Sequence, residues 1–506
     1  MKNKTYLLLP VLSGILTAVS FQSEHFSFIV FISLIPLFIC ILKSELSALK
    51  AVFAFYFSYG IFLFSWISEL KPVIPAKQPL SSVIIILGLV AMSTVSTVRI
   101  AAAMLFYSRI KKGSYFDVIS FSFLFVLGEW IQEKAFFMPF PWARLGIIAA
   151  PITVFVQSAS IFGSLFISFL ILLINGSIAF AFVHRSEISK AYPAGLTAAV
   201  CIALNLSYGL ISMTNLPKSN TVNVCLVQGN YSGISKWTES TEKMLDSYIK
   251  LTKNSINSDT DIVFWPESAI PIFLNLSEKE NNIISNFTKS NNITLVTGSF
   301  YKSNNDMYNS IYVSDKNGKI KCVYSKKILV PIGEDIPLYS LISKIPFLSR
   351  MTANLECYSA GKDTGCIKTD SGSFAGMICY ESIFPCASRE AVKDGGEYIA
   401  IISNDSWFND SVALYQHHSH AIMRAIENRR YTVSCSNTAI TSVIDYKGNV
   451  VKMAKKHIPT VLMSIIIPNK KTSLYAKFGD VIVMPGIILW LKGFLSFIRE
   501  KTKRAV

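Results

Sequence analysis

Two patterns of hydrophobic and polar residues divide the chain. Long apolar runs follow one another up to about Thr214, whereas most Asp and Glu residues come after Pro217. An apolar run of roughly 20 residues is long enough to cross a bilayer as a helix. Seven spans are predicted before the polar half and one after it, at 5–21, 26–43, 49–68, 82–107, 116–132, 160–183, 194–213 and 480–498.

The polar half has the pattern of an α/β domain. Short apolar runs typical of strands lie at 222–229, 261–266, 293–300, 310–315, 374–379, 397–403, 431–437 and 440–445. Helix-compatible polar stretches lie between them at 236–256, 278–291 and 412–430. Strands mixed with helices of that length predict a layered architecture with buried sheets. We therefore expect three parts: a seven-span membrane region at 1–214, an α/β domain at 215–478, and a last span with a basic tail at 479–506.

Composition supports the membrane assignment. Only 16% of the 506 residues are charged, against about 25% in a typical soluble protein. The net charge of +16 would fit nucleic-acid binding, but no basic stripe interleaved with aromatic residues accompanies it. Membrane proteins collect Lys and Arg in their cytoplasmic loops, so we expect no nucleic-acid partner.

Loop charge predicts the orientation. One set of loops and ends holds Lys2, Lys4, Lys43, Lys50, Arg109, Lys111, Lys112, Arg185, Lys190, Arg499, Lys501, Lys503 and Arg504. The alternate loops hold only Lys71, Lys77, Lys134 and Arg144. The positive-inside rule places both termini in the cytoplasm. With seven spans before it, the domain at 215–478 is expected outside the cytoplasm, which in a bacterium is the periplasmic face of the inner membrane.

Two membrane features remain open at this stage. Arg99 and Glu129 fall within predicted spans, where charges usually face a bundle interior or water. A role toward substrate and a structural role, as snorkelling side chains or an inter-helix pair, both fit them. The FPWARLG stretch at 140–146 has the composition of an aromatic belt, which fits either an interface anchor or a guide for lipid.

Three chemically capable residues each come just after an apolar strand. They are Glu267 in FWPES, Lys326 in YSKKILVPIGE, and Cys379 in GMICYES. Taken singly, each has an ordinary explanation: a turn carboxylate, a surface pair of Lys326 with Lys327, and a small buried thiol.

Together the three residues form a working set. A thiol is mostly protonated near pH 7, so it needs a base and a positive neighbour to become a nucleophile. Glu267 can be the base and Lys326 the positive charge. The residues after Cys379 resemble a helix closed by Gly395, whose N-terminus would favour a thiolate. The Tyr380 N–H, with Lys326, could hold an oxyanion.

Histidines and cysteines predict no metal site. His417, His418 and His420 lie close together, but no HExxH or cysteine spacing accompanies them. We interpret 412–430 as a packed helix with an Arg424–Glu427 surface pair. The nine cysteines contain no CxxC pairing, which argues against zinc-ribbon and redox-pair functions.

Several longer sequence motifs together resemble those of one known protein family. VQGN followed by Trp237, FWPES, YSKKILVPIGE, CYES, SNDSWF and SLYAKFGD together resemble bacterial apolipoprotein N-acyltransferases, whose domain is of the carbon–nitrogen hydrolase (nitrilase) superfamily. The similarity extends over the whole chain. Lys327, Ile328 and Asn409 depart from the usual pattern without touching the three candidate residues.

The resemblance implies a fold and a set of roles. The fold would be a polytopic α-helical membrane bundle plus a nitrilase-like α-β-β-α sandwich. Glu267 would be the general base, Lys326 the oxyanion stabiliser and Cys379 the acylated nucleophile. The supporting residues would be Glu334, Tyr380 and Glu381, with Trp237 binding substrate near the entrance. An aromatic packed under a loop is the alternative for Trp237, and no cofactor is implied.

The implied reaction is acyl transfer between two lipids. A membrane phospholipid would donate a fatty acyl chain to Cys379, and the N-terminal amine of a diacylglyceryl apolipoprotein would accept it. One alternative is a membrane-tethered amidase or nitrilase-type hydrolase of a small amide, which uses the same triad but has no need of eight spans. A transporter or sensor is the other, and it leaves the joint presence of the three residues unexplained.

Overall fold

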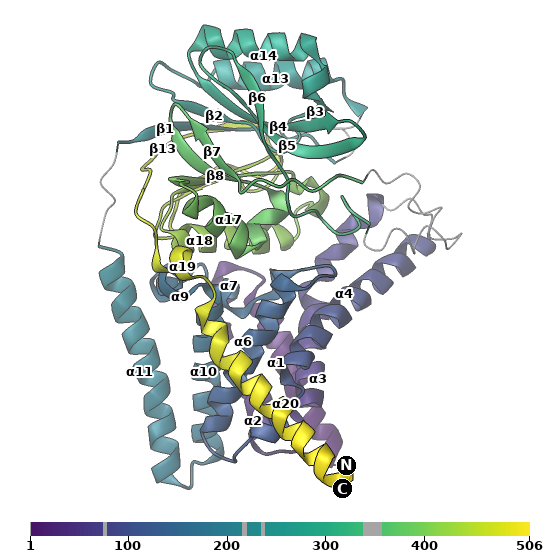
Figure 1. Cartoon of the computed structure of the whole chain (residues 1–506), viewed down its shortest axis with the longest axis vertical. Helices are drawn as coiled ribbons and strands as arrows, with labels where there is room; N and C mark the ends of the chain where they lie inside the picture. The colour runs from purple at the N-terminus through teal and green to yellow at the C-terminus, as the bar shows by residue number, and fades with distance from the viewer. Residues whose placement is uncertain (1, 74–77, 215–219, 234–237, 337–356, 506) are drawn as a thin grey trace. The chain divides into compact units, whose positions relative to one another are not determined.

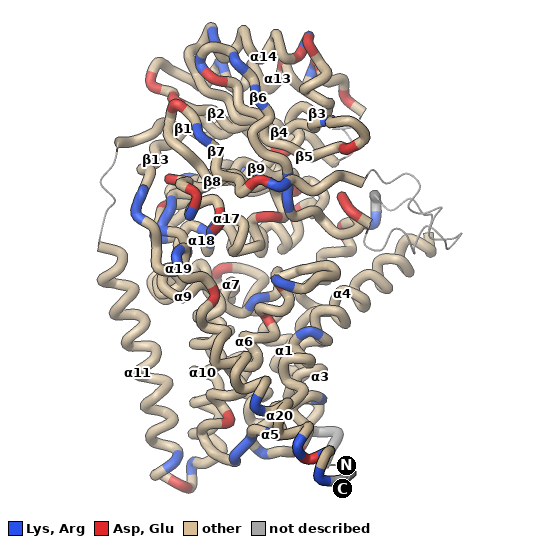
Figure 2. Tube along the Cα trace, viewed as in Figure 1, with Lys and Arg blue, Asp and Glu red and all other residues tan. Residues whose placement is uncertain are grey.

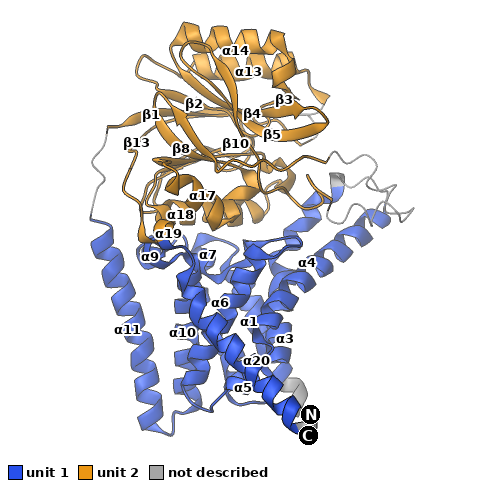
Figure 3. Ribbon diagram, in the orientation of Figure 1, with its two compact units in different colours: residues 1–215, 478–506 blue, residues 216–477 orange. Residues whose placement is uncertain are grey.

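The computed structural model describes residues 2–73, 78–214, 220–233, 238–336 and 357–505 (Figure 1). The chain divides into two compact units (Figure 3). Unit 1 comprises Met1–Asn215 and Phe478–Val506, and unit 2 comprises Leu216–Lys477.

Unit 1 is helical, and a helical segment coincides with each of the eight predicted spans. The main helices are α1 (Lys2–Ser20), α2 (Ile35–Leu42), α3 (Ala48–Leu63), α4 (Leu80–Met104), α6 (Phe116–Lys134), α10 (Ser164–Val183), α11 (Ile188–Ser212) and α20 (Met484–Ala505). Among the described residues, six helical segments are long and apolar enough to cross a membrane. α6 is not one of them, because it carries Asp117, Glu129 and Glu133.

Polar groups inside unit 1 pair with one another. Glu133 of α6 forms a 2.9 Å ion pair with Arg144, which also donates to Ser164 at 2.9 Å. The carboxylate of Glu129 accepts the Leu145 N–H at 2.7 Å. Because a buried charge needs a partner, these contacts explain how carboxylates are tolerated among apolar helices.

Most of the FPWARLG stretch is buried, and its Trp142 packs against aromatic residues of unit 1. Trp142 is only 2% exposed. Its ring centroid lies 5.4 Å from that of Trp66 and 5.7 Å from that of Phe140. The aromatic-belt interpretation is therefore wrong for Trp142.

Basic loops of unit 1 gather at the end that carries both termini, where Lys and Arg positions are frequent (Figure 2). The ammonium of Lys111 donates to Ser44 Oγ at 2.6 Å and to the Ile41 carbonyl at 3.2 Å. Arg109 forms an ion pair with Glu500 near the end of α20. Three segments that are far apart in sequence therefore meet at one end of the helices.

Unit 2 contains two sheets. The seven-stranded sheet has the order β13-β1-β2-β4-β5-β6, with β3 paired to β4, and the six-stranded sheet has the order β12-β11-β10-β9-β8-β7. The first sheet comprises β1 (Val222–Gln228), β2 (Ile262–Phe264), β3 (Ile270–Phe273), β4 (Thr294–Ser303), β5 (Asp306–Ser314), β6 (Ile320–Ser325) and β13 (Thr460–Ile466). The second comprises β7 (Cys366–Thr369), β8 (Gly372–Ile378), β9 (Tyr398–Ser403), β10 (Thr432–Ser436), β11 (Ser442–Ile444) and β12 (Val450–Met453).

Each sheet has helices on its outer face (Figure 1). α13 (Thr241–Lys253) and α14 (Glu278–Asn291) cover the first sheet, whereas α17 (Pro385–Lys393) and α18 (Ala413–Asn428) cover the second. Alternation along β1 explains the layering, because successive side chains of a strand point to opposite faces. Leu226 faces the core between the sheets, and its neighbour Val227 packs with Leu245 and Tyr248 of α13.

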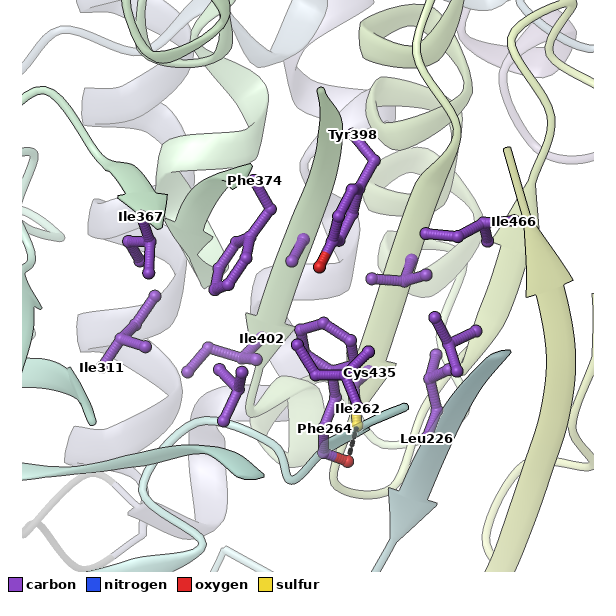
Figure 4. Close-up of a cluster of buried hydrophobic side chains, with 14 of the residues drawn as sticks. Leu226, Ile262, Phe264, Ile311, Ile367, Phe374, Tyr398, Ile402, Cys435 and Ile466 are labelled. Carbon is purple, nitrogen blue, oxygen red and sulfur yellow. Dashed lines mark hydrogen bonds between the residues drawn. The ribbon is translucent and has the colours of Figure 1, made fainter. Parts of the chain in front are cut away.

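The core between the sheets is almost entirely apolar (Figure 4). Phe264 of one sheet lies edge-on to Phe374 of the other, with ring centroids 5.8 Å apart. The Cys435 thiol donates to the Phe264 carbonyl at 3.3 Å across the same gap. Unit 2 is therefore an α-β-β-α sandwich, and the expected fold class is confirmed.

Candidate active site

The three candidate residues each follow the last residue of a strand, as predicted. Glu267 comes after β2, Lys326 directly after β6 and Cys379 directly after β8. The first two strands belong to one sheet and β8 to the other. Lys326 Nζ lies 3.5 Å from Glu267 Oε1, and the charges of both residues act on the pKa of Cys379. The structure therefore brings all three together.

Lys326 is buried between two carboxylates. Its ammonium lies 2.8 Å from Glu334 Oε2 and 3.5 Å from Glu267 Oε1, and the residue is 1% exposed. Burial by itself would lower the pKa of Lys326, but the carboxylates of Glu334 and Glu267 outweigh it and raise that pKa. The raised pKa favours the charged form of Lys326, and its burial excludes a surface pair with Lys327. Lys327 is instead half-exposed and pairs with Glu390 at 3.0 Å.

Asn309 of β5 organises this cluster, and it was absent from the sequence-based set. Its amide nitrogen donates to Glu267 Oε1 at 2.8 Å and to Glu334 Oε1 at 2.9 Å. The backbone carbonyl of Asn309 accepts the backbone N–H of Lys326 at 2.8 Å. A single asparagine at the edge of a predicted strand gives no sequence signal for such a role.

Glu267 is fixed from both sides of its carboxylate. Oε1 accepts from Asn309 and Lys326, and Oε2 accepts the Asn404 N–H at 2.7 Å. The turn that carries Glu267 lies directly on Gly298 of β4. A Cβ at Gly298 would approach the Glu267 Cα to 2.7 Å, so this close approach requires glycine.

Cys379 lies in a strained turn. Its φ angle is +50°, in the left-handed region that non-glycine residues seldom adopt and that is often found at functional sites. A five-residue 3-10 turn, η5 (Cys379–Ile383), follows it, and the α-helix begins only at Pro385. A helical segment does begin at the thiol, but it is a 3-10 helix, and the α-helix that ends before Gly395 begins only at Pro385.

The surroundings keep the thiol protonated. Burial raises the pKa of Cys379 well above its usual value, and the carboxylates of Glu267 and Asp405 raise it further, while Lys326 opposes them. A base must therefore take the proton as the sulfur attacks.

Glu381 joins the two strand ends that carry Lys326 and Cys379. It is fully buried. Oε2 accepts the Ile378 N–H at 2.8 Å, and Oε1 accepts from the Tyr324 hydroxyl at 2.6 Å, the Lys327 N–H at 2.8 Å and the Ile328 N–H at 3.1 Å. The supporting role predicted for Glu381 thus has a physical basis, because its carboxylate links the ends of β6 and β8, which belong to different sheets.

Three other predictions have separate outcomes. Tyr380 is buried and packs against Phe384, with ring centroids 5.1 Å apart. Trp237 lies outside the described residues, so its substrate-binding role stays a prediction.

The Arg424–Glu427 pair is formed at 2.9 Å, but both side chains are fully buried. The surface placement of that pair was wrong, because α18 packs on the second sheet with most of its residues covered.

Two further residues next to Cys379 were also missed. Asp405 begins the 3-10 turn η6 (Asp405–Phe408) after β9, and its Oδ1 lies 3.9 Å from the Cys379 sulfur. His417 of α18 contacts the same carboxylate at 3.0 Å. Asp405 lies within the SNDSWF motif that carried the resemblance. His417 was considered only as a metal ligand, because its position on a helix gives no sign of the contact with Asp405.

Comparison with known proteins agrees with this geometry. Residues 223–469 match the family model for carbon-nitrogen hydrolase, and residues 13–177 match that for the apolipoprotein N-acyltransferase N-terminal domain. An apolipoprotein N-acyltransferase of Geobacter metallireducens is 30% identical over 94% of this chain and 92% of its own length. The chain belongs to the apolipoprotein N-acyltransferase family. A relative of the same name from Borreliella burgdorferi is 26% identical over 99% of this chain and 98% of its own length.

Membership of the apolipoprotein N-acyltransferase family makes the protein an enzyme, an acyltransferase with a carbon–nitrogen hydrolase domain and a multi-pass membrane region. Solved structures match the domain more distantly. Nit3 of Saccharomyces cerevisiae has 20% identity and a TM-score of 0.38, covering 50% of this chain and 93% of its own. A carbon-nitrogen hydrolase of Helicobacter pylori has 17% identity and the same TM-score, covering 49% and 89%.

Proposed function

We propose that this enzyme transfers a fatty acyl chain from a membrane phospholipid to the N-terminal amine of a diacylglyceryl-cysteine apolipoprotein, through a thioester on Cys379. One observation carries the proposal. A buried ammonium, a hydrogen-bonded carboxylate and a strained cysteine meet at the strand ends of unit 2, in a chain that also has helices fit to cross a membrane. Relatives that align over 94% and 99% of the chain bear the name apolipoprotein N-acyltransferase, which supports N-acylation as the outcome.

In the first step Cys379 is acylated. Glu267 takes the proton of the thiol as the sulfur attacks the ester carbonyl of the phospholipid, and Lys326 stabilises the oxyanion. The ester C–O bond then breaks. The leaving alkoxide takes the proton from Glu267, so lysophospholipid departs and a thioester remains.

In the second step the acyl chain moves to nitrogen. The α-amino group of the apolipoprotein attacks the thioester carbonyl, and Glu267 accepts its proton. The C–S bond breaks, and the thiolate of Cys379 takes that proton back. The products are an N-acylated lipoprotein and the free enzyme, with no water consumed.

We place the reaction on the periplasmic face of a bacterial inner membrane, in the domain of residues 215–478. The basic loops before α3 and α6 meet the end of α20 at one end of unit 1. By the positive-inside rule that end is cytoplasmic. Seven predicted spans separate the N-terminus from unit 2, which puts unit 2 on the other side.

The first experiment measures the intact mass of the enzyme purified from phospholipid membranes. We expect a fatty-acyl increment on the parent protein that hydroxylamine removes and that Cys379→Ala lacks. A diacylglyceryl peptide added afterwards should discharge the increment and gain it as an amide. Cys386→Ala serves as the control, because it removes another half-buried thiol of the same domain and should leave the increment intact.

A different result would point to the hydrolase alternative. If no acyl increment forms without an acceptor, while small amides are cleaved in a Cys379-dependent reaction, the donor is not phospholipid. An increment that persists in Cys379→Ala would show that another residue carries the acyl group.

A further inference from the structure

A second buried polar network contacts Cys379, separate from Glu267, Lys326 and Glu334. Asp405 Oδ1 lies 3.9 Å from the Cys379 sulfur and 3.0 Å from His417 Nδ1. Asp405 Oδ2 accepts from the hydroxyls of Ser403 at 2.8 Å and Ser436 at 3.2 Å. The ends of β9 and β10 therefore fix this carboxylate beside the sulfur.

The other nitrogen of His417 contacts the backbone of the nucleophile. Nε2 lies 3.2 Å from the Cys379 carbonyl and 2.7 Å from Ser382 Oγ. The Ser382 hydroxyl donates to the Cys379 carbonyl at 2.8 Å, which leaves its oxygen able to accept a hydrogen bond from His417. Both ring nitrogens of His417 thus face acceptors.

The imidazolium form suits this arrangement, because only that form can donate from both ring nitrogens. Electrostatics agrees with the geometry. Burial would lower the pKa of His417, but the Asp405 carboxylate more than offsets it and raises that pKa. Burial would likewise raise the pKa of Asp405, yet His417 and the two serine hydroxyls lower it.

We propose that the Asp405–His417 ion pair positions the Cys379 nucleophile and balances the charge beside it. Asp405 accepts the hydrogen bond of the thiol, and His417 holds both that carboxylate and the Cys379 carbonyl. The pair thereby fixes the strained turn at φ +50°. It also places a cation on the Asp405 carboxylate, which with Glu267 and Glu334 raises the pKa of the Cys379 thiol while Lys326 lowers it. Both are positioning residues, acting through Cys379.

This inference rests on the proposed function, because it assigns a role to residues around its nucleophile. The test therefore begins with a reaction that needs no lipid. The parent, His417→Gln, Asp405→Asn and His418→Gln proteins are purified in detergent and treated with iodoacetamide across the pH range. The rate of alkylation at Cys379 is followed by peptide mass spectrometry.

His418→Gln is the matched control. His418 is the next residue of α18 and is also buried, but its Nε2 contacts Ser442 at 2.9 Å and not the cysteine. Burial, together with the charge of His417, lowers the pKa of His418 to about 4. It is therefore neutral near pH 7, so its replacement removes packing without removing a charge.

We expect the alkylation midpoint of His417→Gln to rise by about one pH unit, which is roughly a tenfold slower reaction below the midpoint. The thiolate then faces a carboxylate that has lost its cation, while the effects of Glu267, Glu334 and Lys326 are common to all variants. The midpoint of Asp405→Asn should stay or fall, because the carboxylate in contact with the sulfur is gone. His418→Gln should match the parent.

Opposite behaviour would overturn the proposal. An unmoved midpoint in His417→Gln, or the same upward shift in all three variants, would assign the network to folding alone. Acylation by phospholipid vesicles is measured in parallel, where His417→Gln should react at least tenfold more slowly with an unchanged half-saturating lipid concentration. If the parent is not acylated at all, the proposed function fails, while the alkylation result still decides the role of the pair.

Discussion

At the scale of single residues, Lys326 is a buried ammonium that two carboxylates stabilise. An unpaired charge in a protein interior costs several kcal/mol, and removing one partner of a buried pair leaves the other uncompensated. Glu267 and Glu334 would repel each other without the cation between them. Asn309 reduces that repulsion, because its amide donates to both carboxylates.

Lys326→Met should therefore abolish most of the activity. We expect acylation of Cys379 to slow by about 100- to 1,000-fold, the range seen when one oxyanion donor is removed. The measurement is the rate at which the acyl increment appears by intact mass. Lys327→Met is the control, because the Lys327 ammonium pairs with Glu390 at the surface and should change the rate less than twofold. Equal losses in both variants would contradict a special role for Lys326.

Sequence reasoning found the residues that end strands and missed those that reach the site from elsewhere. Glu267, Lys326 and Cys379 stand out because a polar group follows an apolar run. Asn309 reaches the site only because β5 pairs with β6, so that the backbone N–H of Lys326, just after β6, donates to the Asn309 backbone carbonyl. His417 enters through the packing of α18 on the second sheet, which no local pattern specifies.

At the scale of elements, Glu381 joins β8 of one sheet to the segment that follows β6 of the other. Four donors meet one carboxylate there, three of them backbone N–H groups. Such an arrangement fixes the strand ends that carry the nucleophile and the ammonium, so the separation of Cys379 from Lys326 depends on it.

Glu381→Gln keeps the size of the side chain but turns one acceptor into a donor. The new NH2 group must face an N–H or a hydroxyl that donates. We expect this unsatisfied contact to lower the free energy of unfolding by about 2–3 kcal/mol. Thermal unfolding in detergent should show a lower Tm, and acylation of Cys379 should slow at least tenfold. Glu390→Gln, altering a half-exposed carboxylate, should leave both unchanged. An unaffected Tm in Glu381→Gln would show that the carboxylate is dispensable.

The strands themselves were predicted well where they are long or buried on both faces. All eight predicted strand runs are strands, because continuous apolar residues between turns leave little alternative. β3, β6, β7, β12 and β13 were missed. β3, β7 and β12 have only four residues each and, unlike the three-residue β2 and β11, are not buried throughout. β6 has six residues, of which only one is fully buried. β13 is longer, but most of its residues are only partly buried.

At the scale of the whole molecule, membrane topology decides where the chemistry takes place. We expect a membrane-impermeant maleimide to label Cys357 in intact spheroplasts of a Gram-negative host, because this cysteine is exposed in unit 2. In a Cys357→Ser background, a cysteine introduced by Lys501→Cys should react only after lysis. Labelled peptides are identified by mass spectrometry. The reverse pattern would place unit 2 in the cytoplasm.

The pairing of β1 with β13 bears on how unit 2 can be inserted into the sequence of a membrane protein. Val222 lies opposite Ile466 in the antiparallel register, so the polypeptide enters and leaves unit 2 on adjacent strands of one sheet. Between them unit 2 has its own core, built by both sheets. A module whose ends leave side by side is one that can be inserted into another protein with little disturbance of its host. Unit 2 therefore has the properties of a domain inserted into the sequence between α11 and α20. Because its two ends lie on adjacent strands, it is also a suitable unit to express separately.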